Sequence, residues 1–454
     1  MKQVFYILLL EIFIFFPCQN AYSQAKSENL DNKQFKIGLL RDHEISTLRM
    51  QATAGNWNLT CTRFASQNAS GTSTTDVLQI ELPEGEDATI QTVSSGIFIK
   101  TSNLGEIRGY FSKIEASDGW LLNLDLPNIP DFLTGGGLEI FFSRGNVLIN
   151  NNLRLYEYLC SVVSQMQTCE PEALKAQIIA VRTFCMATKS FPRHATESFD
   201  LCSTDHCMSY IGKGDDRELV DVLIADQKNR VMLHQGKYFF PMTTHTCSGR
   251  LSSIKEVFGK EDTIHISQDD RIDSKSAENC MHSPFFNWIR EISEKDMTAF
   301  LSDVFSTNPR TTINEWIPLS SDQSGRINVF RIKGKIDRPV PNPPLLIDSV
   351  ASGTDFFEKA SQWFGQNAFP SLRFTVESLT QTNIITGKGK GHGAGMCLIG
   401  ADGMAKRGFK FNEILNFYYK NITFSPAVVQ TPNPAATSEK NNPSNPPSPN
   451  INPH

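Results

Sequence analysis

The 454-residue sequence lacks an excess of positive charge. Its 43 lysines and arginines are outnumbered by 48 aspartates and glutamates, which gives a formal net charge of −5. Proteins that bind nucleic acid carry a basic patch or stripe, so this composition gives no support for nucleic acid as a partner. The content of hydrophobic residues, 40%, is ordinary for a globular protein, and the length allows two or three domains.

Long apolar runs are also absent beyond the N-terminus. Residues 4–16 are mostly apolar but are interrupted by Glu11, whereas a membrane helix needs about 20 apolar residues. Lys2 before this run and small residues at 21–23 after it are typical of a secretory signal peptide, which we predict over residues 1–23. The mature protein is then exported, to the periplasm or the cell envelope. An uncleaved N-terminal anchor is the alternative.

The cysteine count excludes complete pairing within one mature chain. The sequence has ten cysteines, and removal of Cys18 with the signal leaves an odd number. Exported cysteines usually form disulfides unless a metal binds their thiolates. Both states therefore remain open for closely spaced cysteines.

The pattern of the remaining chain predicts an α+β fold. Residues 35–147 alternate short apolar runs with Gly and Asn turns, which indicates a β-rich N-terminal module. Residues 148–425 mix helical and strand patterns and are predicted to form a mixed α/β core. Residues 426–454 are rich in Pro, Asn and Ser, which is typical of a disordered tail.

Several elements can be predicted individually. Strands are expected at 36–40, 77–82, 97–100, 120–126, 138–142 and 327–332, with further runs near Ile107 and Val147. Helices are expected at 155–166 and 294–304, and a hairpin at 231–246 with its turn at Gln235–Lys237.

The most informative stretch begins at Pro171, a residue that fits best in a first helical turn. The residues that follow are apolar around nearly the whole circumference of a helix, namely Ala173, Leu174, Ala176, Ile178, Ile179, Ala180, Val181, Phe184 and Cys185. Such a helix is buried. Glu172 lies in its first turn, where it either complements the helix dipole or has a chemical role.

A second block, residues 387–397, holds five glycines within nine residues and contains His392. Glycine permits backbone conformations closed to other residues and allows a ligand to approach closely. A phosphate-binding loop is a poor match, because the block does not end in Gly-Lys-Ser/Thr and that motif gives a histidine no role.

Three blocks together resemble the SpoIID/LytB family of peptidoglycan lytic transglycosylases. They are EALKAQIIAVRTF at 172–184, TCSGR followed by VFG at 246–259, and GKGKGHGAGMC at 387–397. The match covers about residues 140–425. The chain departs from the family pattern at Gln165, where a glutamate is usual, at Ser248, where a glycine is usual, and at Lys390 and Leu398.

The resemblance implies that residues 148–425 are a catalytic core with a glycan-binding cleft. It also implies that Glu172 is the catalytic acid/base and that Lys175, Gly391, His392 and Gly393 bind substrate. The implied activity is non-hydrolytic cleavage of denuded peptidoglycan glycan strands to 1,6-anhydro-muramic acid ends, in cell-wall remodelling or division, with no cofactor needed for catalysis. It also implies an N-acetylmuramoyl amidase as a partner. The alternative is a non-catalytic peptidoglycan-binding module that recruits an amidase. From the residues alone, His392 could instead pack its own loop, and Lys175 could be a solvated helix lysine.

A candidate metal site lies at residues 194–207. Cys202, His206 and Cys207 lie within six residues, and His194 precedes them; thiolate and imidazole groups in fours bind zinc tetrahedrally. A Cys202–Cys207 disulfide is the alternative. The resemblance implies zinc for some family members, and four protein ligands make such a zinc structural. The resemblance also implies a Cys247–Cys280 disulfide.

Overall fold

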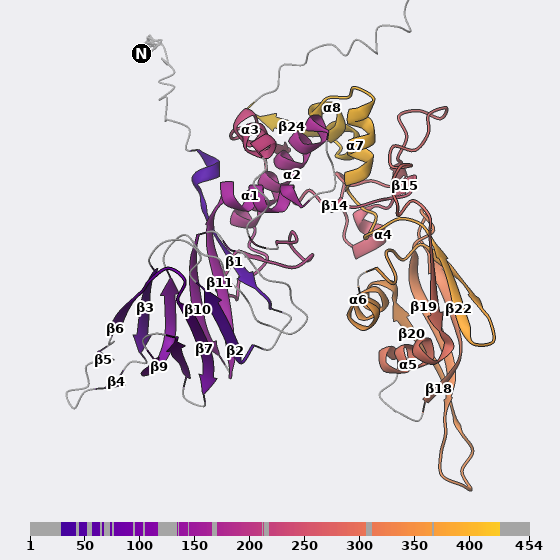
Figure 1. Cartoon of the computed structure of the whole chain (residues 1–454). Helices are drawn as coiled ribbons and strands as arrows, with labels where there is room; N and C mark the ends of the chain where they lie inside the picture. The colour runs from indigo at the N-terminus through magenta and orange to yellow at the C-terminus, as the bar shows by residue number, and fades with distance from the viewer. Residues whose placement is uncertain are drawn as a thin grey trace, which may run out of the picture.

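The structure is a computed structural model of the chain (Figure 1). It describes residues 29–426 apart from 42–44, 52–56, 64–65, 68–72, 75–76, 94–95, 103–104, 117–133, 135, 144, 166–169, 211, 213–217, 306–310 and 366. The predicted signal peptide, the strand at 120–126 and nearly all of the predicted tail lie outside these residues. Within the described ranges, no helix combines the length and the apolar character that a membrane crossing needs.

A sheet of ten strands dominates the N-terminal region, in the order β12-β1-β11-β10-β9-β8-β7-β2, with β3 attached to β9 and β6 to β3. β1 pairs in parallel with β12, and the other pairings in this sheet are antiparallel. The strands are β1 Gln34–Leu39, β2 Thr47–Gln51, β3 Trp57–Arg63, β6 Val77–Leu82, β7 Asp87–Val93, β8 Gly96–Thr101, β9 Gly105–Ala116, β10 Gly137–Ser143, β11 Asn146–Arg154 and β12 Leu201–Cys202.

Alternation of side chains explains how this sheet forms a core. In β2, Leu48 and Met50 are buried while their neighbours Thr47 and Arg49 are exposed, because successive side chains of a strand point to opposite faces. The α+β fold with a β-rich N-terminal region is confirmed. The boundary expected at residue 147 falls within β11, so the sheet continues into the following region.

The helix α2 (Pro171–Ser190) begins at the predicted residue and contributes to two hydrophobic cores. Its side with Leu174 and Ile178 packs into the first core, which also contains the inner face of the sheet and α1 (Leu155–Ser164). Its side with Ala173 and Ala176 packs into a second core. This double contact is the reason why the helix is apolar nearly all round.

The second core is completed by the C-terminal part of the chain. Its elements are β13 Val231–His234, β14 Thr243–Thr244, β23 Met396–Cys397, α7 Leu398–Lys406, α8 Phe411–Tyr418 and β24 Ile422–Ser425. The predicted hairpin at 231–246 is wrong beyond its turn: β13 pairs with β24, not with the residues that follow it. His234 and Lys237 form the expected tight turn, but Pro241 cannot donate to a strand ladder.

A third core lies within residues 288–385, on the opposite side of the helices from the N-terminal sheet (Figure 1). The predicted helix at 294–304 and strand at 327–332 are confirmed as α5 and β19. The region contains β17 Trp288–Ser293, α5 Glu294–Phe305, β18 Thr311–Ser321, β19 Ile327–Ile336, β20 Leu345–Ser352, α6 Gly353–Phe364, β21 Phe374–Ser378 and β22 Thr382–Gly387. The remaining elements are η1 Leu30–Asn32, β4 Ser66–Gln67, β5 Ser73–Thr74, α3 Glu218–Asp226, β15 Arg250–Leu251, α4 Ile254–Phe258 and β16 Gln268–Asp269.

Candidate functional site

Glu172 lies where two helices begin. It is the second residue of α2, after Pro171, and its side chain is 21% exposed. Its Oε2 accepts a hydrogen bond from the backbone N–H of Phe411, the first residue of α8, at 2.9 Å. Because the N-terminal ends of helices carry unpaired N–H groups and a partial positive charge, both helices attract this carboxylate.

Lys175 lies one helical turn further along and connects Glu172 to a second carboxylate. Its Nζ is 3.2 Å from Glu172 Oε1 and 3.1 Å from Asp226 Oδ2 at the end of α3. The hydrogen bond from Lys175 is the main cause of a lowered pKa at Asp226. Asp226 was not identified from the sequence, since nothing in its local pattern indicates that α3 ends beside Glu172.

Asp402 in α7 holds the start of α2. Its Oδ1 accepts from the backbone N–H of Glu170 at 3.3 Å, and its Oδ2 lies 2.7 Å from Lys406 Nζ and 3.3 Å from His282 Nε2. Asp402 is buried, and the residue whose backbone it binds, Glu170, lies two positions before Glu172. It therefore positions the helix terminus that carries Glu172.

The glycine block adopts a regular left-handed pattern. Every second residue from 389 to 395 is a glycine with φ between 80° and 93°. A Cβ at Gly391 would lie 2.7 Å from Thr244 Oγ1, and one at Gly393 would lie 2.0 Å from Arg326 Cζ. At these two positions glycine therefore allows the loop to pack closely against Thr244 and Arg326 of the protein itself. Substrate binding by Gly391 and Gly393 remains a prediction.

His392 is half-buried, and its ring nitrogens contact the backbone. Nδ1 accepts a hydrogen bond from the N–H of Ala394 at 3.1 Å, and the other nitrogen donates to the Thr243 carbonyl. Burial, followed by the charge of Arg326, lowers the pKa of His392 to about 4, so the ring is neutral at pH 7. These contacts brace the loop, and a role in substrate binding remains a prediction.

The four predicted metal ligands converge. The ligand atoms of His194, Cys202, His206 and Cys207 lie within 4.8 Å of one another, and neither cysteine is in a disulfide. His194 Nε2 is 3.3 Å from Cys207 Sγ, while His206 Nδ1 is 3.6 Å from Cys202 Sγ and 3.7 Å from Cys207 Sγ. Zinc bonds of about 2.3 Å to sulfur and 2.0 Å to nitrogen put tetrahedral ligand atoms about 3.3–3.8 Å apart. The residues therefore fit zinc.

The surroundings of this cluster also suit a metal. His194 Nδ1 lies 3.1 Å from Glu197 Oε1, and a carboxylate in this position commonly orients a histidine ligand. Hydrogen bonding from the Cys207 thiol, with smaller contributions from Thr204 and His206, lowers the pKa of Cys202. This direction favours the thiolate, which is the form that binds a metal.

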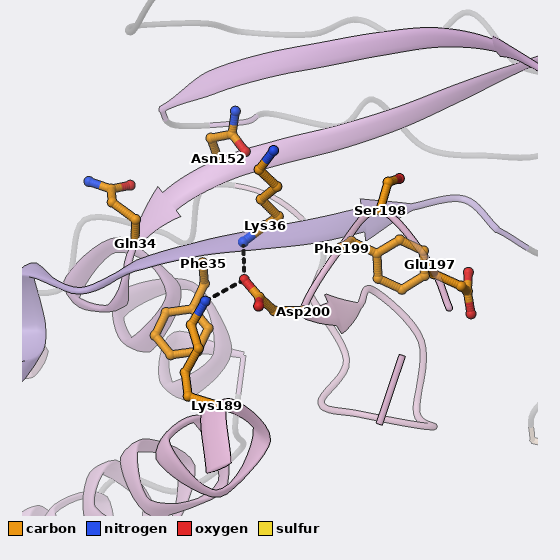
Figure 2. Close-up of a pocket in the computed structure, with 9 residues that line it drawn as sticks. All are labelled: Gln34, Phe35, Lys36, Asn152, Lys189, Glu197, Ser198, Phe199 and Asp200. Atoms are coloured by element: carbon orange, nitrogen blue, oxygen red, sulfur yellow. Dashed lines mark hydrogen bonds and ion pairs between the residues drawn. The ribbon is translucent and has the colours of Figure 1, made fainter. Parts of the chain in front are cut away.

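A hollow of about 700 Å³ lies between β1 and the segment that precedes β12. It is lined by Gln34, Phe35, Lys36, Asn152, Lys189, Glu197, Ser198, Phe199 and Asp200 (Figure 2). The ring of Phe199 is 4.6 Å from that of His194, which connects the hollow to the cluster. None of Glu172, Lys175 or His392 lines it. The glycan-binding cleft expected around Glu172 thus remains a prediction.

The structure corrects one expectation around the TCSGR block and explains the departure at Ser248. Cys247 and Cys280 do not form a disulfide, because their sulfurs are 3.6 Å apart and both thiols are free. Ser248 has a φ of 57°, in the left-handed region that favours glycine. This backbone conformation explains why glycine suits the position. The Ser248 hydroxyl compensates by donating to the Phe286 carbonyl.

Comparison with known proteins supports the resemblance. The SpoIID family model, described as "Stage II sporulation protein", matches residues 143–234, which include α1, α2 and the His/Cys cluster. An uncharacterized protein of Brachyspira hyodysenteriae is 26% identical over 338 residues, covering 74% of this chain and 81% of that protein. An amidase enhancer of Bacillus subtilis is 23% identical over 291 residues, covering 56% of this chain and 38% of the Bacillus protein.

These matches indicate a function related to the cell wall and its peptidoglycan. The matched segment contains the helix that begins with Pro171 and Glu172, and the Bacillus relative independently points to the same family. Residues 143–234 therefore match the SpoIID family, and this match and the Bacillus relative agree with the resemblance to SpoIID/LytB proteins.

Proposed function

We propose that the protein is a peptidoglycan lytic transglycosylase with Glu172 as its catalytic acid and base. The observation that carries this proposal is the position of the Glu172 carboxylate. It is partly exposed, at the junction of α2 and α8, and is held by one backbone N–H and one lysine. A carboxyl group in this setting can reach a substrate and is restrained in its orientation.

The reaction needs one carboxyl group. Protonated Glu172 donates its proton to the glycosidic oxygen, and the bond from that oxygen to the muramic acid C1 breaks. The resulting carboxylate then takes the proton of the muramic acid 6-hydroxyl, whose oxygen bonds to C1 and closes the 1,6-anhydro ring. No water is consumed, so a second carboxylate to activate water, as in hydrolases, is not required.

Lys175 must release Glu172 when Glu172 carries a proton. Its ammonium can then remain paired with Asp226, which lies 3.1 Å away on the other side. Burial opposes the charge on Lys175, but its hydrogen bonds to Asp226 and Glu172 raise its pKa. The ammonium thus persists through the cycle and is available to the carboxylate groups of a glycan substrate.

We further propose that His194, Cys202, His206 and Cys207 bind a structural zinc ion. Such an ion would tie the segment after α2 to β12 without an open coordination position. When His206 binds through Nδ1, its Nε2 carries the proton, and the present 2.9 Å contact of that nitrogen with Arg193 must open. Metal analysis of the full chain with and without Cys202→Ser and Cys207→Ser tests this assignment.

The second candidate function is a peptidoglycan-binding module that recruits an N-acetylmuramoyl amidase. One observation favours it, namely that a relative of this chain is named amidase enhancer. Under both proposals the protein acts outside the cytoplasm, in the periplasm or the cell envelope, after export directed by residues 1–23. A pull-down of denuded glycan strands and of an amidase distinguishes binding from cleavage.

The deciding experiment is digestion of stem-peptide-free glycan strands, with products weighed by mass spectrometry. We expect wild-type protein to release products lighter by one water molecule than hydrolytic products, and Glu172→Gln to release none. The matched control is Glu170→Gln, since Glu170 lies two residues earlier and its side chain makes no capping hydrogen bond. The control should retain activity.

Each outcome is informative. Products that contain the added water would identify a hydrolase and refute the proposal. Equal activity of wild type and Glu172→Gln would remove Glu172 from the mechanism. Retention of glycan strands without cleavage would favour the binding module. Circular dichroism of both variants confirms that loss of activity does not reflect unfolding.

A further inference from the structure

Three cysteines and one aspartate that are far apart in the sequence meet in the second core. Cys247, Asp270, Cys280 and Cys397 each have 0% exposed surface. One ligand atom from each lies within 4.8 Å of the others. Cys247 Sγ is 3.1 Å from Asp270 Oδ2 and 3.6 Å from Cys280 Sγ. Tetrahedral zinc with sulfur and oxygen ligands places such atoms about 3.5–3.8 Å apart. The Cys247–Cys280 distance is within this range, and Asp270 would move by a few tenths of an ångström on binding.

Backbone N–H groups point at the sulfur of Cys397. The N–H groups of Cys247 and Gly400 each lie 3.3 Å from it. A metal-bound thiolate is a better acceptor than a neutral thiol, and ligands are commonly oriented by such outer contacts. A Cβ at Gly400 would lie 2.3 Å from the Tyr418 hydroxyl and 2.8 Å from Asp270 Oδ2. Glycine therefore lets the first turn of α7 approach the cluster.

Asp270 is oriented with one oxygen toward the thiols. Its Oδ1 accepts from the Tyr418 hydroxyl at 2.8 Å and from Asn279 Nδ2 at 3.1 Å. Its Oδ2 faces Cys247 Sγ. Hydrogen bonding of one carboxylate oxygen while the other faces the ligand atoms is the arrangement expected of a metal-binding aspartate. A metal ion would supply the compensating charge that a carboxylate without exposed surface needs to stay ionised.

We propose that Cys247, Asp270, Cys280 and Cys397 form a closed tetrahedral zinc site, separate from the His194 cluster. Thiolate ligands favour zinc over magnesium and calcium, which prefer oxygen. A disulfide explains the cluster less well, because it would use two of the three thiols and give no role to the Asp270 oxygen that faces them. Four protein ligands leave no position for substrate, so the zinc is structural.

The site would fasten together the segments around Glu172. Cys247 follows β14, Cys397 caps α7, and Asp270 and Cys280 lie on the loop between β16 and β17. α7 carries Asp402, which holds the backbone of Glu170 at the start of α2. Loss of this zinc should therefore loosen the start of α2, although no ligand of the zinc contacts Glu172 in the part of the chain that the structure describes.

The test uses the full chain with Cys202→Ser and Cys207→Ser, which removes the thiolates of the other cluster. Zinc bound after gel filtration in mild chelator is measured by mass spectrometry. We expect this protein to bind one zinc ion per chain. The zinc should be lost when Cys397→Ser is added and retained when Cys185→Ser is added instead. Cys185 is the matched control, because it is fully buried in α2 but lies outside the cluster.

A second measurement does not depend on whether Cys397→Ser folds. In the Cys202→Ser, Cys207→Ser protein, Co²⁺ should replace zinc and give sulfur-to-cobalt charge-transfer bands, and X-ray absorption should report three sulfurs and one lighter atom. Asp270→Cys should convert this shell to four sulfurs. Two results would overturn the proposal. One is a protein without bound metal in which Cys247, Cys280 and Cys397 all react with an alkylating reagent, and the other is a Cys247–Cys280 disulfide found by peptide mapping.

Discussion

Loss of the buried ion pair between Arg182 and Asp31 should destabilise the protein strongly. Arg182 lies in the middle of α2 with 0% exposed surface, and Asp31 in η1 is 5% exposed. Arg182 Nε is 2.8 Å from Asp31 Oδ1, and Nη2 is 3.3 Å from Oδ2. The substitution Asp31→Asn removes the negative charge and leaves the arginine charge buried without its partner.

The magnitude follows from burial. Breaking one side of a buried pair costs about 3–5 kcal/mol. One kcal/mol shifts the unfolding midpoint of a domain of this size class by about 2–4 °C, so Asp31→Asn should lower it by roughly 10 °C. Arg182 Nη1 also donates to the carbonyls of Gln227 and Arg230, and these bonds retain part of the local structure.

The assay combines thermal unfolding by circular dichroism with hydrogen exchange of peptides from α2. The matched control is Asp348→Asn, which breaks a bidentate pair with Arg331 of similar geometry. Both side chains of that pair are exposed, at 38% for Arg331 and 53% for Asp348, so the midpoint should remain unchanged. An equally small shift for Asp31→Asn would refute the argument from burial.

A double substitution sharpens the test. Asp31→Leu with Arg182→Met replaces the pair by apolar side chains, which is often neutral or stabilising for buried pairs. We expect the double variant to recover most of the stability lost in Asp31→Asn. Recovery should be incomplete, because the carbonyls of Gln227 and Arg230 then lack a donor.

Two further predictions concern the glycine block. First, Gly395→Ala should lower the unfolding midpoint more than Gly408→Ala. Both glycines have positive φ, but a Cβ at residue 395 would lie 1.9 Å from the Met242 carbonyl oxygen, whereas no atom lies within 4 Å of a Cβ at residue 408. Equal midpoints for the two variants would contradict this prediction. The folded-state pKa of His392, about 4, is below its ordinary 6.5, so the unfolded state binds more protons in this window and stability should fall as pH drops from 6.5 to 4. His392→Asn should flatten that slope when the unfolding midpoint is measured against pH. The part due to His245 should remain, because its pKa is lowered likewise, mainly by burial. An unchanged slope would contradict the lowered pKa of His392.

The sequence alone was sufficient for features that depend on local pattern. The start of α2 at Pro171, its burial on nearly every side and the alternation of the N-terminal strands all follow from spacing and residue type. The His194–Cys207 cluster was also predictable, because its ligands lie within fourteen positions of one another. Glu172 was identified through its family motif, and its contact with Phe411 was not foreseen.

Features that depend on distant parts of the chain were missed. The local pattern predicts a hairpin at 231–246, but β13 pairs with β24 near the C-terminus. The Cys247–Cys280 pairing was expected as a disulfide, whereas Asp270 and Cys397 join the same cluster. Long-range pairing depends on tertiary context that a local pattern does not contain.

The two-sided packing of α2 also imposes an order of events on folding. The first core uses residues up to about 240, so the Leu174 side of the helix can pack before the C-terminal part of the chain is available. The Ala173 side is completed only by Met396 and the residues after it. During that interval a strip of apolar surface stays open to solvent and to other unfolded chains. A chain that stops before residue 396 would keep this strip exposed permanently and should be a target for chaperones and proteases.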